Sequence, residues 1–410
     1  MTRVILGPRW LIPPIVVATS PRGIRDIVGV RDGSVDKTSR VATELRKLLG
    51  GNLFVLPHAE WLPRRRTLQP VFTRQRVSQF AGHMAEAAEV ACATWGGEPA
   101  IDLDAQCRAL TLQALSRSVL GLDLHEGTDA VIEPLRVATS YAVARAVRPL
   151  RAPAWLPTLA RWRARTAAAK IRALADDILQ PCRADPSREA PLVQALLAAT
   201  DPQTGQPLSD KAIRDELVMF LFAGHDTTAT TLTYALWALG RHLDLQERVA
   251  DEVAQLGDRQ LTPDDVGQLG FTVRVLQEAL RLCPPGPTGT RMATRDVEVA
   301  GYRVKAGTML AFGRMAVQRD PSLWDDPLTF DPDRFLPERA AARDRWQYVP
   351  FGGGPRSCIG DHFAMLEATL ALATIVRRVR FHSLEDDFPL TVPFTMVAAG
   401  PIAAQVRLRT

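Results

Sequence analysis

A single cysteine, Cys358, stands between a glycine-rich loop and a long apolar run, and this arrangement restricts the chain more than any other feature. Residues 351–360 spell Phe-Gly-Gly-Gly-Pro-Arg-Ser-Cys-Ile-Gly, and apolar residues then recur at helical spacing from Ile359 to Val379. A cysteine at a helix start faces unpaired N–H groups and the positive end of the helix dipole, which favour the thiolate. A thiolate beside glycines, which let a flat ligand approach the backbone closely, is a candidate metal ligand.

The other interpretation of this cysteine is a buried, inert side chain beside a turn, and it would be preferable if the cysteine stood alone. Here the spaced positions Phe351, Gly354, Arg356, Cys358 and Gly360 are filled together. The pattern Phe-x-x-Gly-x-Arg-x-Cys-x-Gly resembles the haem-binding loop of the cytochrome P450 family. The resemblance implies that Cys358 is the axial thiolate of a haem b iron, that Arg356 pairs with a haem propionate and that Phe351 packs beside the sulfur, with Gly360 completing the haem loop.

Composition excludes several other classes of protein. Of the 410 residues, 46% are hydrophobic and 23% are charged, which is ordinary for a soluble globular protein. The five cysteines are scattered and form no Cys-x-x-Cys pair, which argues against a disulfide framework or a zinc site and for a reducing compartment. The net charge of +5 gives no case for nucleic acid, but it leaves room for a basic patch that meets an acidic protein partner.

The N-terminal region contains no predicted targeting or membrane-spanning segment. Residues 11–18 form an apolar stretch with two prolines, whereas a spanning helix needs about twenty apolar residues. No small-residue cleavage site follows it, so the chain is expected to be cytoplasmic. The basic, alanine-rich segment Arg161–Arg172 could form a membrane-surface helix, but its apolar stripe is weak, and a solvated helix face is favoured.

The periodic segments predict one large, mainly α domain, residues 1–410, with small antiparallel β-sheets. No internal repeat, low-complexity tract or long linker interrupts it. Helices are expected at 77–93, 104–119, 157–179, 209–241, 245–256, 271–282 and 359–379. Strands are expected at 12–18, within 297–312 and, more weakly, near 390–409.

The longest predicted helix, Ser209–Arg241, breaks helix rules at its centre, where residues 223–231 spell Ala-Gly-His-Asp-Thr-Thr-Ala-Thr-Thr. Glycine and threonine are poor helix formers, and threonine can bend a helix by bonding to the i−4 carbonyl. One interpretation is a small-residue packing groove with a kink. However, Ala-Gly-x-Asp-Thr-Thr resembles the oxygen-activation motif of the same family, which implies that Asp226 and Thr227 organise water and deliver protons.

A predicted ion pair joins Glu278 and Arg281, three residues apart on one helix face. On a surface such a pair contributes only about a few tenths of a kcal/mol. Residues 330–335, Phe-Asp-Pro-Asp-Arg-Phe, resemble a second family element, whose arginine joins the Glu-x-x-Arg pair behind the haem. The resemblance therefore implies a buried structural triad of Glu278, Arg281 and Arg334.

Further arginines are candidates for binding the haem propionates. Trp61-Leu-Pro-Arg-Arg65 resembles the family's Trp-x-x-x-Arg element, whose indole and guanidinium groups both donate hydrogen bonds, as a carboxylate requires. Arg291 occupies the place of another propionate arginine. Arg65 could instead belong to a solvated run with Arg64 and Arg66, and these two neighbours could help to dock an acidic ferredoxin or flavodoxin.

Taken together, the resemblance runs from about residue 13 to the C-terminus and implies a monooxygenase that inserts one oxygen atom of O2 into a lipophilic small molecule. Family members usually carry several dozen residues before the strand near 12–18, so the chain is N-terminally short for the family. About fifty residues follow Cys358 without a nucleotide or flavin motif, so electrons are expected from a separate ferredoxin- or flavodoxin-type donor and its reductase. A monomer is expected.

Two alternatives remain open: a peroxide-driven haem-thiolate oxygenase or isomerase, and a non-catalytic haem- or lipid-binding protein. Peroxide-driven members tend to lose the acid–alcohol pair that this chain keeps. The predicted pocket is apolar without an obvious charge, which favours a neutral, bulky terpenoid, steroid or polyketide-like substrate. Its predicted walls are Phe220, Phe222, Ala223, Gly224, Thr288, Gly289, Thr290, Phe394, Thr395 and Met396.

Overall fold

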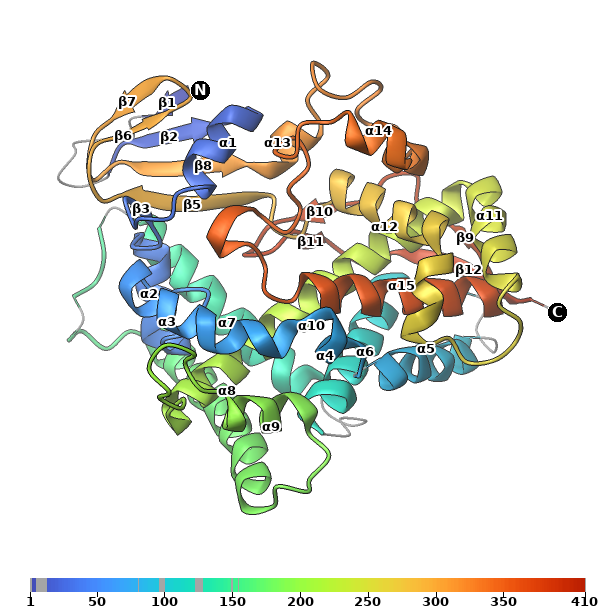
Figure 1. The fold of residues 1–410 in the computed structure, drawn as a ribbon, viewed down its shortest axis with the longest axis horizontal. Coiled ribbons are helices and arrows are strands. Elements are labelled where there is room, and N and C mark those ends of the chain that lie inside the picture. The colour runs from blue at the N-terminus through green and yellow to red at the C-terminus, as the bar shows by residue number, and fades with distance from the viewer. Residues whose placement is uncertain are drawn as a thin grey trace.

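A 32-residue helix, α10 (Asp210–Arg241), runs through the interior, and other long helices pack around it (Figure 1). The computed structural model describes residues 2–4, 13–79, 81–95, 100–121, 128–148, 150–153 and 155–409. The helices that pack most extensively against α10 are α6 (Leu103–Leu115), α8 (Leu159–Ala184), α12 (Gly270–Leu282) and α15 (Asp361–Arg378). Most of the α10 side chains are buried, so this helix forms the axis of the main hydrophobic core.

The other helices enclose this axis. Several begin at a side-chain cap that satisfies a free N–H group of the first turn, as Ser209 does for α10 and Thr158 for α8. The longer ones are α1 (Pro21–Val28), α2 (Arg40–Leu49), α3 (His58–Leu68), α5 (Ala81–Trp95), α7 (Thr128–Val147), α9 (Pro191–Ala198) and α11 (Leu243–Ala254). The short ones are α4 (Arg74–Ser78), α13 (Arg314–Gln318), α14 (Pro337–Ala341) and the 3₁₀ turns η1 (Gln69–Phe72), η3 (Pro263–Gln268), η4 (Pro332–Phe335) and η5 (Gly354–Arg356).

The largest sheet has five strands in the order β1-β2-β8-β5-β3 and forms a second hydrophobic cluster with α1. Its strands are β1 (Thr2–Val4), β2 (Ile15–Ala18), β8 (Met309–Gly313), β5 (Thr288–Ala293) and β3 (Val35–Asp36). A three-stranded sheet has the order β4-β12-β9, and two hairpins pair β6 with β7 and β10 with β11. These strands are β4 (Ala100–Asp102), β12 (Ala403–Leu408), β9 (Val379–Ser383), β6 (Val297–Val299), β7 (Tyr302–Val304), β10 (Leu390–Thr391) and β11 (Val397–Ala398).

The predicted fold class, mainly α with small antiparallel sheets, is confirmed, with one parallel ladder as the exception. Strand β2 pairs with β8 in parallel, Ile15 opposite Met309, while the other described ladders are antiparallel. The first residues of the predicted strand at 12–18 include residue 12, which lies outside the described residues. A parallel partner nearly 300 residues away leaves no turn signal in the sequence.

The predicted helices are present with shifted ends. The helix expected at 77–93 is divided into α4 and α5, and residue 80 between them lies outside the described residues. The helix expected at 104–119 ends at Leu115 and continues as a π turn, Ser116–Leu120, which stops at Gly121 in the left-handed conformation. The sequence analysis missed α1, α2, α3, α7 and α9, and in α3 an internal Pro63 obscured the helical pattern.

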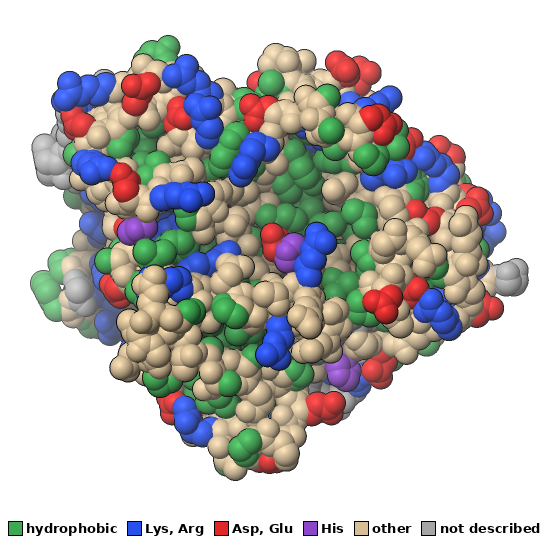
Figure 2. All heavy atoms as spheres, viewed as in Figure 1, with side chains coloured by type: hydrophobic (Ala, Val, Ile, Leu, Met, Phe, Trp, Pro, Cys, Tyr) green, Lys and Arg blue, Asp and Glu red, His purple; other side chains and the backbone are tan. Residues whose placement is uncertain are grey.

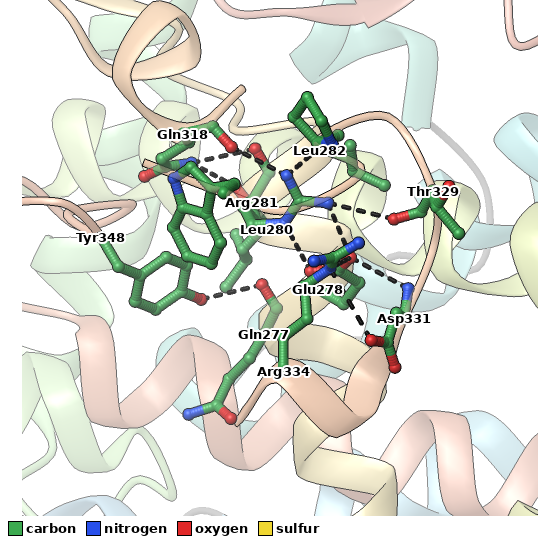
Figure 3. A network of polar contacts seen from close by, with 12 residues as sticks. Gln277, Glu278, Leu280, Arg281, Leu282, Gln318, Thr329, Asp331, Arg334 and Tyr348 are labelled. Carbon is green, nitrogen blue, oxygen red and sulfur yellow. Dashed lines mark hydrogen bonds and ion pairs between the residues drawn. The ribbon is translucent and has the colours of Figure 1, made fainter. Parts of the chain in front are cut away.

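A buried ion pair anchors helix α12 (Figure 3). Glu278 and Arg281 are fully buried, and the guanidinium donates two hydrogen bonds to the carboxylate, at 2.6 and 2.7 Å. Arg281 also donates to the carbonyl oxygens of Gln318 at 2.8 Å and Pro327 at 2.7 Å. One side chain therefore joins α12 to two segments that lie 37 and 46 residues further along the chain.

Arg334 completes the cluster that the sequence predicted. Its Nε lies 3.3 Å from Oε1 of Glu278, and the backbone N–H of Asp331 donates to the same carboxylate oxygen at 3.0 Å. The Tyr348 hydroxyl donates to the carbonyl of Gln277 at 2.9 Å, so α12 also holds the chain that leads into the cysteine loop. The structure thus brings Glu278, Arg281 and Arg334 together, and their geometry suits a structural role.

We predict that Arg281→Leu lowers the free energy of unfolding by about 3–5 kcal/mol, because it leaves the Glu278 carboxylate buried without its partner. Urea unfolding followed by circular dichroism measures this change. The control is Arg339→Gln, since Arg339 is exposed and lies 3.9 Å from Asp331. It should change the unfolding free energy by less than about 1 kcal/mol. Equal effects of the two variants would contradict a structural role for the buried pair.

A second buried carboxyl group lies between α15 and α10. Glu367 is fully buried, and neither carboxyl oxygen has a hydrogen-bond partner among the described residues. Burial raises the pKa of Glu367 well above its ordinary value of 4.5, and the neighbouring Thr228 opposes this shift. The folded protein therefore holds this proton more tightly than the unfolded chain does.

From this pKa shift we predict a specific pH dependence of stability. The contribution of the protonated Glu367 is fully present below pH 4.5 and is lost as the pH rises towards the raised pKa. The variant Glu367→Gln has no carboxyl group to ionise at this position and does not lose stability in this way. The difference in unfolding free energy between the variant and the parent protein should therefore grow in favour of the variant by as much as about 1.4 kcal/mol per pH unit. Urea unfolding at several pH values tests this, and parallel pH profiles of the two proteins would exclude it.

Candidate active site

Hydrogen bonds and close packing fix the loop before α15. The Cys358 N–H donates to the carbonyl of Phe351 at 2.9 Å, which closes the loop on itself. Gly354 has a φ of +66°, and a Cβ atom there would lie 2.0 Å from the carbonyl oxygen of Val28. Only glycine fits this position, so the loop lies directly on the end of α1.

Cys358 is the one exposed cysteine of the chain, whereas the other four are buried. No group of three His, Cys, Asp or Glu side chains in the described part of the chain could hold a metal ion. An iron whose other ligands come from a macrocycle would need only the thiolate of Cys358 from the protein.

Cys358 lies outside the helix that follows it, contrary to the prediction that it stands at the helix start. Helix α15 begins at Asp361, three residues beyond Cys358, so the thiol does not lie at its first turn. Although Cys358 is accessible to solvent, the protein atoms packed around its sulfur raise the pKa of the thiol by partial desolvation, and Asp361 raises it further. The Gly360 N–H, Arg65 and Arg314 act in the opposite direction without outweighing the desolvation. The protein alone therefore favours the thiol, and a metal cation is the partner that would stabilise the thiolate.

Four cationic side chains gather beside this loop, and Asp36 is the acid among them. Arg356 donates to Asp36 at 2.7 Å and to the Leu56 carbonyl at 2.9 Å. Burial, together with Arg356 and Arg314, lowers the pKa of Arg291 to about 9, and burial lowers the pKa of Arg314 to about 10. Burial and these same arginines also lower the pKa of Lys37 well below its ordinary range.

This excess of positive charge fits a ligand with two carboxylates. A buried cation without an anion is costly, so the cluster favours an anionic group from outside the chain. The predicted residues Arg291 and Arg356 belong to this cluster, and they come from β5 and η5. Lys37 and Arg314 were missed, because a single basic residue in a loop or a short helix carries no local signal.

Helix α3 brings Trp61 and Arg65 to the same side. Trp61 is buried, and the Arg356 guanidinium stacks 4.5 Å from the centre of its ring. Arg65 donates to the Ser357 carbonyl at 3.1 Å, next to the cysteine, and to the Gln69 side chain at 2.7 Å. Arg65 therefore contacts the loop and is not part of a solvated run.

The docking role predicted for the two arginines next to Arg65 is contradicted. Arg64 donates to the fully buried Glu216 of α10 at 2.8 Å, and Arg66 donates to Asp201 at 2.9 Å. Both guanidinium groups are committed to ion pairs within the protein. The sequence could not show this, because the acidic partners lie more than 130 residues away.

The centre of α10 is helical throughout. The Thr227 hydroxyl donates to the Ala223 carbonyl at 2.7 Å, and four further threonines form the same i−4 bond. Asp226 is held from two directions, because Arg108 of α6 donates to one carboxylate oxygen and Thr395 donates to the other. Arg108 also donates to Asp104 at 2.7 Å. Sequence analysis missed Arg108, whose α6 position carries no motif.

Aromatic side chains gather beside Asp226. The ring of Phe394 lies 5.2 Å from that of Phe222 and 5.8 Å from that of Phe54, measured between ring centres. Phe220 is buried and lies 5.2 Å from Phe72. The structure therefore groups Phe222, Phe394 and Thr395, and it places Phe220 in the core next to η1. The predicted Ala223 is half-buried on the same stretch of α10.

Other predicted pocket positions differ from the expectation. Met396 is buried with its sulfur 3.6 Å from Sγ of Cys283, so its side chain belongs to the core. A Cβ atom on Gly224 would lie 3.1 Å from Leu115, so its bare face packs against α6. On β5, Gly289 packs against a ring of the neighbouring strand, while its neighbours Thr288 and Thr290 are at least partly exposed.

Comparisons with known proteins agree with this geometry. The sequence model of the family described as Cytochrome P450 matches residues 5–407. The chain is 34% identical to cyclooctatin synthase of Streptomyces melanosporofaciens, covering 97% of this chain and 86% of that protein. It is 30% identical to pentalenene oxygenase of Streptomyces avermitilis, covering 93% and 84%.

Among solved structures, the crystal structure of the cytochrome P450DA haem domain superposes with a TM-score of 0.86 at 27% identity, covering 99% of this chain and 89% of that one. The family match extends over nearly the whole chain, and it includes the cysteine loop, the buried Glu-x-x-Arg pair and the acid–alcohol pair of α10. The chain belongs to the cytochrome P450 family of haem-thiolate monooxygenases.

Proposed function

We propose that the protein binds haem b and inserts one oxygen atom of O2 into a neutral, lipophilic molecule of the terpenoid class. The observation that carries the cofactor assignment is the exposed Cys358 beside a buried excess of cations. Relatives named cyclooctatin synthase, cyclooctat-9-en-7-ol 5-monooxygenase and pentalenene oxygenase support the substrate class. The aromatic rings near Asp226 offer apolar contact to such a molecule.

In this proposal the haem supplies a redox-active iron that activates O2. Cys358 holds the iron, with Phe351 and Gly360 in the same loop. Arg65, Arg291 and Arg356 form hydrogen bonds and ion pairs with the haem carboxylates. Lys37 and Arg314, which the structure places beside them, are two further candidates for this role. Trp61 packs against Arg356 and keeps its guanidinium in place. The proposed carboxylate contacts would relieve the repulsion among these cations.

Asp226 and Thr227 are proposed to carry protons to the reacting oxygen. Both oxygens of Asp226 are already engaged, by Arg108 and by Thr395. Each carboxylate oxygen can still accept a second hydrogen bond, from water or from Thr227, and a proton would pass through that contact. Thr227 donates its own proton to Ala223, and its oxygen keeps lone pairs that can accept one. Arg108 and Thr395 are therefore proposed as positioning residues.

Electrons are proposed to arrive from a ferredoxin- or flavodoxin-type protein at the surface beside the cysteine loop. A hollow of about 610 Å³ lies there, lined by Gly352 to Pro355 and Ser357. Arg31, Arg345 and His58 also line it, and no acidic residue does. This basic lining suits an acidic partner. We therefore propose this hollow as the docking site in place of Arg64 and Arg66. The protein is proposed to act as a monomer in the cytoplasm.

Optical titration of the ferric protein is the first test. Terpenoids, steroids, fatty acids and macrolides are added in turn, and we expect the haem band to shift towards the high-spin form with terpenoids. The Cys358→Ser variant is the control, since its haem content can be matched while the thiolate is removed. Binding of charged acids alone would contradict the substrate class, and failure of the parent to retain haem would contradict the cofactor assignment.

The proton route makes a separate prediction. Thr227→Ala and Asp226→Asn should lower electron-supported product formation by about a hundredfold, the usual effect of removing a proton-transfer group. Thr233→Ala is the matched control, because Thr233 forms the same i−4 bond on α10 at 2.8 Å but lies away from the acid. Product formation is measured with a surrogate ferredoxin and reductase. Full activity of the parent with peroxide and none with electrons would favour the peroxide-driven alternative.

A further inference from the structure

Two neighbouring carboxylates of α10 bind the backbone of the loop between α2 and α3, residues 50–57. Asp215 accepts a hydrogen bond from the Gly51 N–H at 2.9 Å. Glu216 accepts one from the Leu53 N–H, which lies 3.1 and 3.2 Å from its two oxygens. We name these contacts the carboxylate clamp, which consists of the two acids and the two backbone N–H groups. The clamp ties alternate residues of the loop to adjacent residues of one helix.

Burial distinguishes these two acids from most charged side chains of the protein. Acidic and basic side chains are spread over the surface shown in Figure 2. Asp215 and Glu216, in contrast, are 3% and 0% exposed. A buried carboxylate is costly unless it is paired and hydrogen-bonded. Arg64 of α3 donates to Glu216 at 2.8 Å, and Lys211 donates to Asp215 at 2.7 Å, so the clamp also joins α3 to α10.

The loop lies directly against the first of these carboxylates. Gly50 ends α2 with a φ of +84°, and a Cβ atom there would lie 2.2 Å from Oδ1 of Asp215. Only glycine fits both this conformation and this space. The Gly50 N–H donates to the Arg46 carbonyl at 3.1 Å, which connects the loop to the last turn of α2. Close packing and hydrogen bonds therefore fix the same few residues.

The residue that follows the clamp is Phe54, whose side chain is 38% exposed. The centre of its ring lies 5.8 Å from that of Phe394, one of the proposed substrate contacts. Nζ of Lys37 lies 3.9 Å from the centre of the Phe54 ring. The Phe54 N–H donates to the Asn52 side chain at 3.1 Å, within the same loop. A change in the backbone at 51–53 would therefore move the Phe54 ring relative to that of Phe394.

We propose that Asp215 and Glu216 are positioning residues for substrate selection, because they fix the backbone that presents Phe54 to the pocket. The ionised carboxylate of Glu216 holds the loop most firmly, since it accepts hydrogen bonds from both Leu53 and Arg64. Protonation removes the charge that pairs with Arg64 and converts one acceptor oxygen into a donor. The inference rests on the proposed haem site and pocket, and it adds the groups that set the position of one wall.

The ionisation of Glu216 falls near neutral pH. Burial raises the pKa of Glu216 to about 7, and Asp215 acts in the same direction. Arg64 and the Leu53 N–H oppose this shift, which means that both contacts favour the ionised form. The charged side chains around Glu216 come from α10, α3 and α2 and are Asp215, Lys211, Arg64 and Arg46. The loop should therefore be held more firmly at pH 8 than at pH 6, one unit on either side of this pKa.

The first measurement is backbone hydrogen exchange of peptides that cover residues 50–56 in the haem-loaded protein. After correction for the intrinsic rate, the parent protein should exchange at least about threefold faster at pH 6 than at pH 8. Glu216→Gln should exchange at the faster rate at both pH values. The matched control is Glu252→Gln, because Glu252 of α11 also accepts backbone N–H groups, from Phe271 at 2.6 Å and Thr272 at 2.8 Å. It should leave exchange of the loop unchanged.

The second measurement is optical titration of the ferric haem with imidazole and with 4-phenylimidazole, which differ by one phenyl ring. Phe54→Ala should lower the preference for 4-phenylimidazole by about three- to tenfold, as loss of an aromatic contact does. Glu216→Gln should lower it in the same direction at pH 8 and should match the parent protein at pH 6. Because variant and parent are compared at the same pH, protonation of the two azoles cancels. Glu252→Gln should keep the preference of the parent at both pH values.

Unchanged exchange of the loop in Glu216→Gln at pH 8 would overturn the clamp. An unchanged azole preference in Phe54→Ala, or in Glu216→Gln at pH 8, would overturn its role in substrate selection. An equal effect of Glu252→Gln would also overturn it, since a general loss of stability would then explain the result. Failure of the parent protein to retain haem would contradict the proposed function instead, and hydrogen exchange would still test the clamp because it needs no ligand.

Discussion

A partly buried excess of positive charge beside the cysteine loop is the constraint on which the site depends. Lys37 follows β3 in a loop, whereas Arg291, Arg314 and Arg356 come from β5, α13 and η5. Asp36 is the acidic neighbour of Lys37, Arg291 and Arg356. Burial lowers the pKa values of all four side chains, and the neighbouring arginines contribute to the lowered pKa values of Lys37 and Arg291, so these charges are costly in the absence of a further anion. A ligand with two carboxylates would offset the free-energy cost of these cations. Because such a ligand binds the folded state, its binding would also stabilise that state against unfolding. The same ligand would join the five-stranded sheet, α13 and the cysteine loop.

The position of the cysteine follows from two rigid supports. On one side Gly354 lies against the end of α1, so close that no side chain fits there. On the other side α12 carries the buried pair of Glu278 and Arg281, which binds carbonyl oxygens from residues 318 to 329. Tyr348 extends this support to within three residues of the loop. The Glu278–Arg281 ion pair would contribute little on a surface. Here it stabilises the cysteine loop without belonging to it, because its hydrogen bonds are buried and reach backbone groups distant in the sequence.

The features that could be predicted from the sequence are those that a local pattern carries. The cysteine loop, the centre of α10 and the Glu-x-x-Arg pair each lie within about ten residues, and the structure shows them as compact units. Lys37, Arg314 and Arg108 could not be found, because each acts through partners brought near by tertiary packing alone. Arg64 was misassigned for the same reason, since its partner Glu216 follows 152 residues later. The parallel pairing of β2 with β8 has a comparable origin, because register between distant strands is set by the sheet.

The centre of α10 shows how a helix can carry polar groups without breaking. Each of five threonines donates its hydroxyl proton to the carbonyl four residues earlier, so none of these five hydroxyl donors is left unsatisfied. Asp226 cannot satisfy itself in this way, because a carboxylate only accepts. It therefore takes Arg108 from α6 and Thr395 from the segment beyond β10. The acid is thus tied to the element that carries Phe394, next to the proposed substrate contacts. A substrate that moves this segment would also move Thr395, which donates a hydrogen bond to Asp226. Substrate binding would in this way change how firmly the carboxylate of Asp226, the proposed proton carrier, is held.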